Sequence, residues 1–196
     1  IMKENLDYLA SFADEVVNFA TPKPHTPEEI MAVWDGVDGI IAGVEPYTAQ
    51  MLENAPSTLK VISRYGVGFN SIDVDAAAER GIVVTNTPGA NSMAVAELTM
   101  GLLLAVVRNI PSNSATVKEG KWERQMSIGL EGKTLGILGL GAIGRNVANA
   151  AKAFHMRVIA YDPFWPEQFA AEKQIERKHK NGLVILFYQK FTQAFN

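Results

Sequence analysis

The sequence predicts an α/β protein with two parallel-sheet domains, and three observations carry this prediction. Short apolar runs that suit buried strands alternate with helical segments through most of the 196 residues, which is the pattern of a parallel sheet. A glycine-rich turn at 139–144 joins one such strand to a helix. A segment at 92–107, apolar on nearly every side, separates the two series of strands. We therefore assign a partial first domain to 1–91 and an incomplete second domain to 92–196.

In the first predicted domain, the elements follow from apolar runs and from the residues that cap helices. Residues 15–19 form a short strand candidate. A helix is expected to begin at Thr26, because Pro27 suits its first turn and Glu29 completes a capping box. Further along the chain, we expect strands at 37–43, 59–63 and 82–85, and helices at 48–54 and 74–80.

The second predicted domain contains two further strands and a helix between them. The polar residues at 111–120 are expected to form a connection, and the strands are expected at 134–138 and 157–161. The charged run at 174–180 is expected to be the solvated face of a helix. The uncharged run at 183–188 has high β-propensity and is a candidate for the next strand of the sheet.

The glycines of the turn after the first of these strands each suit a different role. Gly139 permits a tight turn, Gly141 lets the backbone approach a pyrophosphate closely, and Gly144 lets the helix pack against the strand. The main-chain amides near Ala142 and Ile143 are expected to point at the phosphates, where the helix dipole favours negative charge. The turn therefore predicts a dinucleotide-binding βαβ unit, and a glycine-rich turn in an ordinary α/β protein is the alternative.

Asp162 stands at the end of the strand that follows this helix. A carboxylate at this position can accept hydrogen bonds from the ribose hydroxyls of the adenosine half of a dinucleotide. It would also repel a 2′-phosphate. The expected cofactor is therefore NAD and not NADP.

Composition narrows the function classes further. The net charge is −3 and no basic stripe is visible, so a nucleic-acid partner is not expected. The chain has no cysteine, which excludes disulfides and thiolate metal sites and is compatible with a cytoplasmic protein. No apolar run approaches the roughly 20 residues of a membrane span. Ile1 is not a natural initiator, so the start is expected to be trimmed.

The apolar segment at 92–107 is expected to be a helix. A helix that is hydrophobic all round is buried, and in a two-domain protein it is expected between the domains or in a subunit interface. We therefore expect a homodimer that forms through this helix.

Several runs between residue 59 and about residue 163 resemble those of one enzyme family. They stand at 61–70, 81–89, 95–97, 120–122 and 138–145. In these runs the chain resembles the D-isomer-specific 2-hydroxyacid dehydrogenases, whose members include D-3-phosphoglycerate dehydrogenase. The resemblance implies two Rossmann-like or flavodoxin-like domains and hydride transfer between NAD(H) and a small 2-hydroxy or 2-oxo acid. A phosphoglycerate dehydrogenase would act in serine biosynthesis.

The resemblance also implies binding residues. The loop of Gly66, Val67 and Gly68 would offer backbone N–H groups to the substrate carboxylate. Val67 and Val95 would lie close to the nicotinamide half of the cofactor. Arg64 matches a position that helps to hold the substrate phosphate in phosphoglycerate dehydrogenases, and a solvated strand-end arginine is the alternative.

The chain lacks one arginine that binds the substrate phosphate in phosphoglycerate dehydrogenases. Phosphoglycerate dehydrogenases carry another phosphate-binding arginine just after the earlier strand. Here residues 41–45 contain no arginine and one acid, Glu45. An unphosphorylated 2-oxo acid therefore stays open as the substrate, beside 3-phosphoglycerate.

The family's catalytic arginine, histidine and carboxylate have no counterparts that can be placed in this chain. His25, His155 and His179 are expected to be solvated or structural, and no carboxylate is expected to partner any of them in a cleft. The second domain is therefore expected to be truncated after its first βαβ unit, and the chain is expected to be inactive by itself. A non-catalytic remnant that binds nucleotide or only dimerises is the alternative function.

Overall fold

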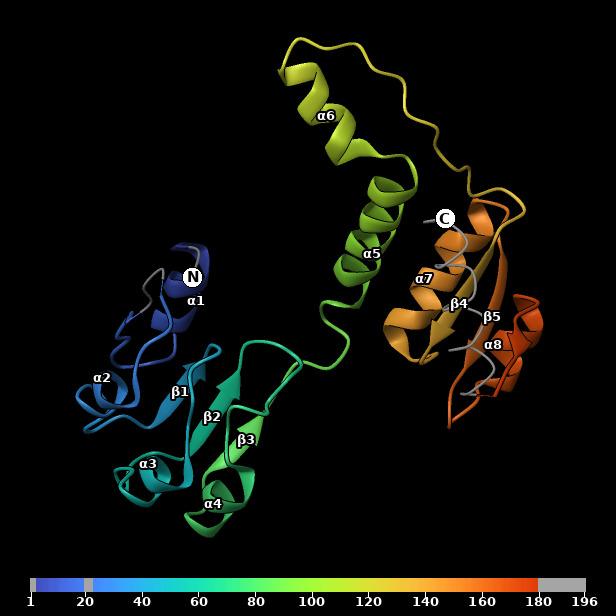
Figure 1. Cartoon of the computed structure of the whole chain (residues 1–196). Helices are drawn as coiled ribbons and strands as arrows, with labels where there is room; N and C mark the ends of the chain where they lie inside the picture. The colour runs from blue at the N-terminus through green and yellow to red at the C-terminus, as the bar shows by residue number, and fades with distance from the viewer. Residues whose placement is uncertain (1–2, 20–22, 180–196) are drawn as a thin grey trace. The chain divides into compact units, whose positions relative to one another are not determined.

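The computed structural model describes residues 3–19 and 23–179 of the chain. The chain divides into two compact units, Ile1–Pro88 and Gly89–Asn196, and each contains a three-stranded sheet (Figure 1). All strand pairs within the named strands are parallel. The predicted α/β class with parallel sheets is therefore confirmed.

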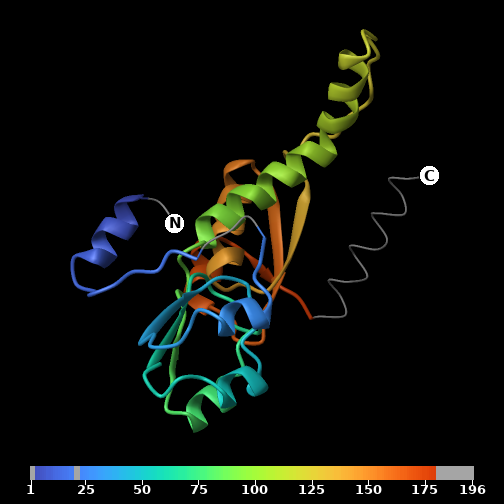
Figure 2. The same ribbon diagram turned by 90° about the vertical axis from the view of Figure 1, so that its left-hand side faces the viewer.

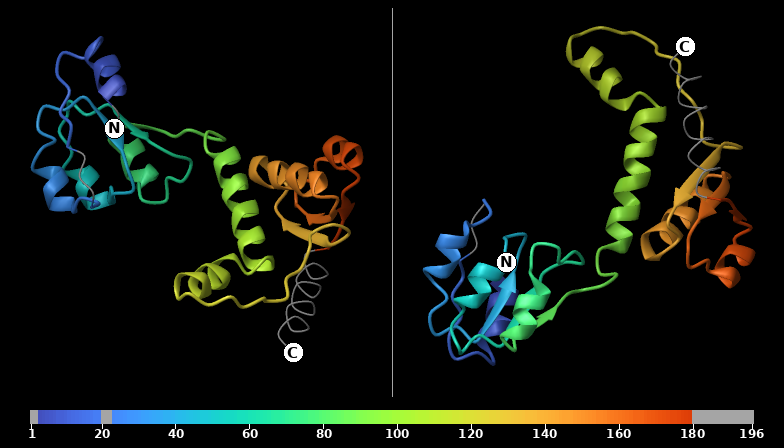
Figure 3. Two further views of the ribbon diagram at one scale, coloured as in Figure 1. Left: turned by 90° about the horizontal axis from the view of Figure 1, so that it is seen from above. Right: turned by 60° about the horizontal axis from the view of Figure 1, so that its bottom comes forward.

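The first unit carries its sheet in the order β1-β2-β3 (Figure 1), and Figure 3 shows the same unit from two further sides. Its elements are α1 (Lys3–Ala10), α2 (Pro27–Met31), β1 (Gly39–Ala42), α3 (Ala49–Glu53), β2 (Val61–Arg64), α4 (Val74–Glu79) and β3 (Val83–Thr85). The register pairs Ala42 with Arg64, and Ser63 with Thr85. The loops that follow the three strands therefore leave from the same edge of the sheet. The core includes Leu52 and Ile62, whose side chains are fully buried.

The starts of α2, α3 and α4 follow the capping rules. Thr26 and Glu29 form the predicted capping box at the start of α2. Thr48 and Asp73 cap α3 and α4 through their side-chain oxygens. The strand expected at 15–19 is wrong, because these residues are not part of a strand in the described chain and Val17 is 61% exposed. A run with β-propensity forms a strand only where a neighbour accepts its backbone hydrogen bonds.

The second unit carries its sheet in the order β4-β5-β6. Its elements are α5 (Ser92–Val107), α6 (Ile110–Lys118), β4 (Thr134–Leu138), α7 (Ala142–Ala153), β5 (Arg157–Tyr161), α8 (Glu167–Glu172) and β6 (Glu176–Arg177). Buried residues of α5, α7, β4 and β5 form one hydrophobic core. The strand candidate at 183–188 lies outside the described residues.

Two expectations about the second unit are wrong. The charged run expected as a helical face contains β6, because Glu176 pairs with Ile159 at the open edge of β5. The polar segment at 111–120 forms most of α6 instead of an irregular connection. No residue of α6 is buried, so hydrophobic periodicity could not reveal this helix.

Helix α5 is covered on one face within the described chain. Ala96 and Met100 are buried in the core that α5 shares with α7, whereas Leu98, Leu102 and Val106 are 59–65% exposed. Helix α6 continues beyond the end of α5 at an angle of 62° (Figures 1 and 2). No single described helix is long and apolar enough to cross a membrane, and α5 and α6 would pass this test only as a bent pair.

Candidate functional site

The glycine-rich turn leads from β4 into α7, and its geometry explains two of its glycines. Gly139 has a φ of +93°, a backbone conformation that favours glycine, and its N–H donates to Tyr161 O over 2.8 Å. A Cβ built on Gly144 would lie 2.1 Å from the Gly139 carbonyl oxygen. The turn therefore has no room for a side chain at position 144, and α7 packs directly against the end of β4.

The start of α7 presents backbone donors. Gly141 is the N-cap residue, no side chain caps the helix, and a Cβ built on Gly141 would meet no atom within 4 Å. Ala142 and Ile143 are exposed in the first turn. Because the first N–H groups of a helix have no partner within it, this end of α7 can bind an anion such as a pyrophosphate.

Asp162 connects the end of β5 to this turn. Its Oδ2 accepts a hydrogen bond from Leu140 N over 2.5 Å, and its Oδ1 accepts one from Phe164 N over 2.7 Å. The contact with Leu140 spans 22 positions of the chain and has no signal in the sequence. A carboxylate has about four acceptor positions, so these two bonds leave capacity for ribose hydroxyls.

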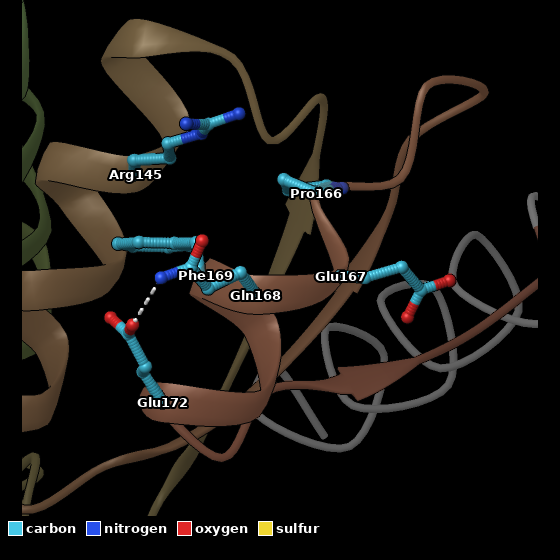
Figure 4. Close-up of a pocket in the computed structure, with 6 residues that line it drawn as sticks. All are labelled: Arg145, Pro166, Glu167, Gln168, Phe169 and Glu172. Atoms are coloured by element: carbon cyan, nitrogen blue, oxygen red, sulfur yellow. Dashed lines mark hydrogen bonds between the residues drawn. The ribbon is translucent and has the colours of Figure 1, made fainter.

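Arg145 contacts both the turn and α8. Its Nε donates to Leu140 O over 3.0 Å, and its guanidinium lies over the Phe169 ring, 5.5 Å from the centroid. A pocket of about 430 Å³ is lined by Arg145 and by five residues at the start of α8 or within it (Figure 4). These five are Pro166, Glu167, Gln168, Phe169 and Glu172. Two of them are acids, so the pocket has no excess of positive charge for a phosphate.

The second predicted site lies in the first unit, in the loop after β2. Three successive carbonyl oxygens of this loop are occupied by donors from the chain. Tyr65 O accepts a hydrogen bond from the Arg64 guanidinium. Gly66 O accepts one from Thr87 N over 3.0 Å, and Val67 O accepts one from Asn86 Nδ2 over 2.7 Å. Gly66 has a φ of +142°, which only glycine adopts readily.

In contrast to these carbonyl oxygens, two backbone N–H groups of the loop have no acceptor among the described residues. Within the described part of the chain, the N–H groups of Val67 and Gly68 donate to no protein acceptor, whereas Gly66 N donates to Arg64 O over 2.8 Å. Val67 is 37% exposed, and a Cβ built on Gly68 would meet no atom within 4 Å. Two successive backbone donors that lack a protein acceptor suit a carboxylate.

Arg64 lies across the loop and not out in solvent. Its guanidinium donates to Tyr65 O, and a Cβ built on Gly66 would lie 2.8 Å from its Nη1. Its Nε is buried and has no hydrogen-bond partner among the described residues. Val95 belongs to α5 in the second unit, so its closeness to Val67 and to a nicotinamide stays a prediction.

The three histidines lie in separate parts of the described chain. His25 stacks on Phe19 with ring centroids 4.0 Å apart, and its Nδ1 lies 3.5 Å from Glu29 Oε2. Glu29 stands four residues beyond His25 and its side chain is 56% exposed, so this contact is a surface pair and not a partnership in a cleft. His155, with a φ of 56°, follows Phe154, the C-cap residue of α7, and His179 is exposed after β6. No group of three metal-ligating side chains occurs among the described residues.

The comparisons with known proteins agree on one enzyme family. A family model described as "D-isomer specific 2-hydroxyacid dehydrogenase, catalytic domain" matches residues 1–194. The chain is 52% identical over 131 residues to D-3-phosphoglycerate dehydrogenase of Methanocaldococcus jannaschii, a match that covers 66% of this chain and 25% of that protein. It is 48% identical over 143 residues to hydroxypyruvate reductase of Thermotoga maritima, covering 71% of this chain and 46% of that protein.

A solved structure agrees with these relatives. D-lactate dehydrogenase from Aquifex aeolicus, complexed with NAD and lactic acid, is similar with a TM-score of 0.77 and 27% identity. The similarity covers 93% of this chain and 55% of that one. The chain thus spans 25% and 46% of the two curated relatives and about half of the solved one.

Proposed function

This chain belongs to the D-isomer-specific 2-hydroxyacid dehydrogenase family, and we propose that its protein is an NAD-dependent oxidoreductase acting on a 2-hydroxy or 2-oxo acid. The observation that carries the proposal is the turn between β4 and α7. Gly144 has no room for a side chain, Gly141 has open space, and no side chain caps the helix. This combination fits the diphosphate of a dinucleotide.

The residues that would hold NAD are those of the turn and the acid beside it. Gly139 shapes the turn, Gly141 leaves space for the diphosphate, and the amides of Ala142 and Ile143 would donate to it. Asp162 would accept hydrogen bonds from the hydroxyls of the adenosine ribose while it keeps its hydrogen bond with the Leu140 amide. NAD supplies the carbon that gives or accepts the hydride.

The substrate carboxylate would bind at the loop after β2. The amides of Val67 and Gly68 are its donors, and the Arg64 guanidinium beside Gly66 adds positive charge. This arrangement suits the carboxylate that every 2-hydroxy and 2-oxo acid carries. For 3-phosphoglycerate, and so for a role in serine biosynthesis, the neighbouring acid Glu45 is unfavourable. An unphosphorylated acid such as hydroxypyruvate is therefore the alternative substrate.

We also propose that the chain forms a homodimer through α5. The exposed leucines of this helix, Leu98 and Leu102, lie one turn apart, and Val106 continues the same stripe. Contiguous exposed apolar surface of this kind marks an interaction site. A second copy is the simplest partner, because it offers the same apolar stripe.

The 196 residues by themselves should lack turnover. Each of the three histidines is either held by local contacts or exposed at an element's end, and none faces an arginine and a carboxylate together among the described residues. A non-catalytic chain that only binds nucleotide or dimerises is therefore the second candidate function for the chain alone.

The proposal is tested by titrating NAD into the isotopically labelled chain and following backbone amide signals by NMR. We expect the largest shifts at Gly141, Ala142 and Ile143, with an affinity weaker than that of a complete dehydrogenase. Shifts confined to another part of the chain, or no shifts at millimolar NAD, would refute the cofactor site.

A further inference from the structure

We infer that Asn86 is a positioning residue that aims the Gly68 amide at the carboxylate of the substrate. The inference rests on the proposed carboxylate site in the loop after β2, and it adds a residue from a different loop. Asn86 follows β3 directly, and its Nδ2 donates to Val67 O over 2.7 Å. The two residues are 19 positions apart and belong to neighbouring parallel strands and the loops that leave them.

The physical link is the planarity of the peptide bond. The carbonyl of one residue and the N–H of the next lie in one rigid plane and point in opposite directions. Fixing Val67 O toward Asn86 therefore fixes the direction of Gly68 N–H. The bond from Thr87 N to Gly66 O, 3.0 Å long, fixes the direction of Val67 N–H in the same way.

Packing does little to hold this loop in place. Tyr65 is 79% exposed and Phe69 is 43% exposed, and Gly68 has no side chain and open space where one would be. Without large buried side chains, the orientation of the peptide planes depends on hydrogen bonds. One of the two bonds from the loop after β3 comes from a backbone amide, and the other comes from the Asn86 side chain.

A side-chain amide suits this position for a chemical reason. Its NH₂ group donates to a carbonyl oxygen without adding charge beside the site. A carboxylate of the same shape would lose the donor, repel Val67 O and repel an incoming carboxylate. The asparagine therefore orients a donor while it keeps the loop open to anions.

The test compares the unchanged chain with Asn86→Ala. Residual dipolar couplings of the amides report the direction of Gly68 N–H without ligand, and a titration with sodium pyruvate reports carboxylate binding. We expect Asn86→Ala to change the Gly68 coupling and to weaken pyruvate binding by about threefold to tenfold, as the loss of one hydrogen bond predicts. Asn86→Asp, which keeps the shape, should weaken binding further.

A matched control separates positioning from general stability. Asn54 in the same unit donates from Nδ2 to Gln50 O over 2.7 Å, at the end of α3. Asn54→Ala removes an equivalent hydrogen bond, and it should leave the Gly68 coupling and pyruvate binding unchanged. If Asn86→Ala does not fold, Asn86→Asp supplies both readouts.

The outcomes distinguish this inference from the function on which it rests. No pyruvate-dependent shift at Val67 or Gly68 in the unchanged chain would overturn the carboxylate site and the inference with it. Shifts that appear there with the same affinity and the same Gly68 coupling in both Asn86 variants would overturn the inference alone. Reduced affinity together with an altered coupling supports both.

Discussion

The carbonyl oxygen of Gly139 lies 2.1 Å from the point where a Cβ of Gly144 would stand. The contact joins the end of β4 to the first turn of α7 and makes position 144 sensitive to the smallest side chain. The contact is with backbone, which cannot rotate away as a flexible side chain would.

Gly144→Ala should therefore destabilise the second unit. The added methyl group forces α7 away from β4, and overpacking of this kind costs about 3 kcal/mol. Urea unfolding followed by circular dichroism measures the loss. Gly129→Ala, in the segment before β4, is the matched control, because a Cβ there meets no atom within 4 Å. That control should be neutral or stabilising by about 0.5–1 kcal/mol, and equal losses in both variants would contradict the packing argument.

Gly141→Val should abolish NAD binding and leave the fold intact. The open space at this position accepts a side chain, and its φ of −74° suits any residue, so stability should change little. The branched side chain would then occupy the space proposed for the diphosphate. Calorimetric titration with NAD measures the effect, and the same heat from both proteins would mean that the turn is not the cofactor site.

Tyr47 should make the first unit sensitive to alkaline pH. Burial, with a smaller contribution from the charge of Glu45, raises the pKa of Tyr47 to about 12. The unfolded chain loses this proton near pH 10, so it binds fewer protons than the folded chain above that pH. The free energy of unfolding should therefore fall between about pH 10 and about pH 12, by about 1.4 kcal/mol for each pH unit from this residue.

Tyr47→Phe should remove that part of the pH dependence. Tyr8→Phe, at a side chain that is 71% exposed, should leave the dependence as it is. Urea unfolding at several pH values from 9 to 12 provides the comparison. If the free energy of unfolding changed equally with pH in the unchanged chain and in Tyr47→Phe, Tyr47 would ionise as freely in the folded state as in the unfolded one.

Leu102→Glu should convert the proposed dimer into a monomer. The leucine is 59% exposed on α5, and a charge there would have to lose its water in an apolar interface. Sedimentation at micromolar concentration gives the oligomeric state. Val44→Glu, at an equally exposed position of the first unit, should leave the dimer intact. A monomeric unchanged chain would remove the basis for the interface.

The chain of 196 residues should not oxidise NADH with pyruvate, hydroxypyruvate or glyoxylate. Proton transfer and polarisation of the carbonyl both lack a suitable side chain at the described sites. Absorbance at the NADH band measures this directly. Turnover above the rate without protein would show that groups other than an Arg, His and carboxylate set perform the reaction.

Several features of the fold could be predicted from residues that stand close together in the sequence. The capping box of Thr26 and Glu29 was predictable because both partners stand within one helical turn. The strands before and after α7 were predictable from apolar runs that end at glycine or aspartate. The strand expected at 15–19 and the helical face expected at 174–180 were wrong, because β-structure depends on a neighbouring strand that the local sequence does not reveal.

By itself, the sequence determined the α/β class, the glycine turn and its place between strand and helix, because these depend on backbone preferences and short-range periodicity. Only the tertiary structure decided that Asp162 holds the Leu140 amide and that Asn86 holds the Val67 carbonyl. Each bond joins loops that parallel strands carry to the same edge of a sheet. Such partners become neighbours only when the strands pair, so no local pattern records them.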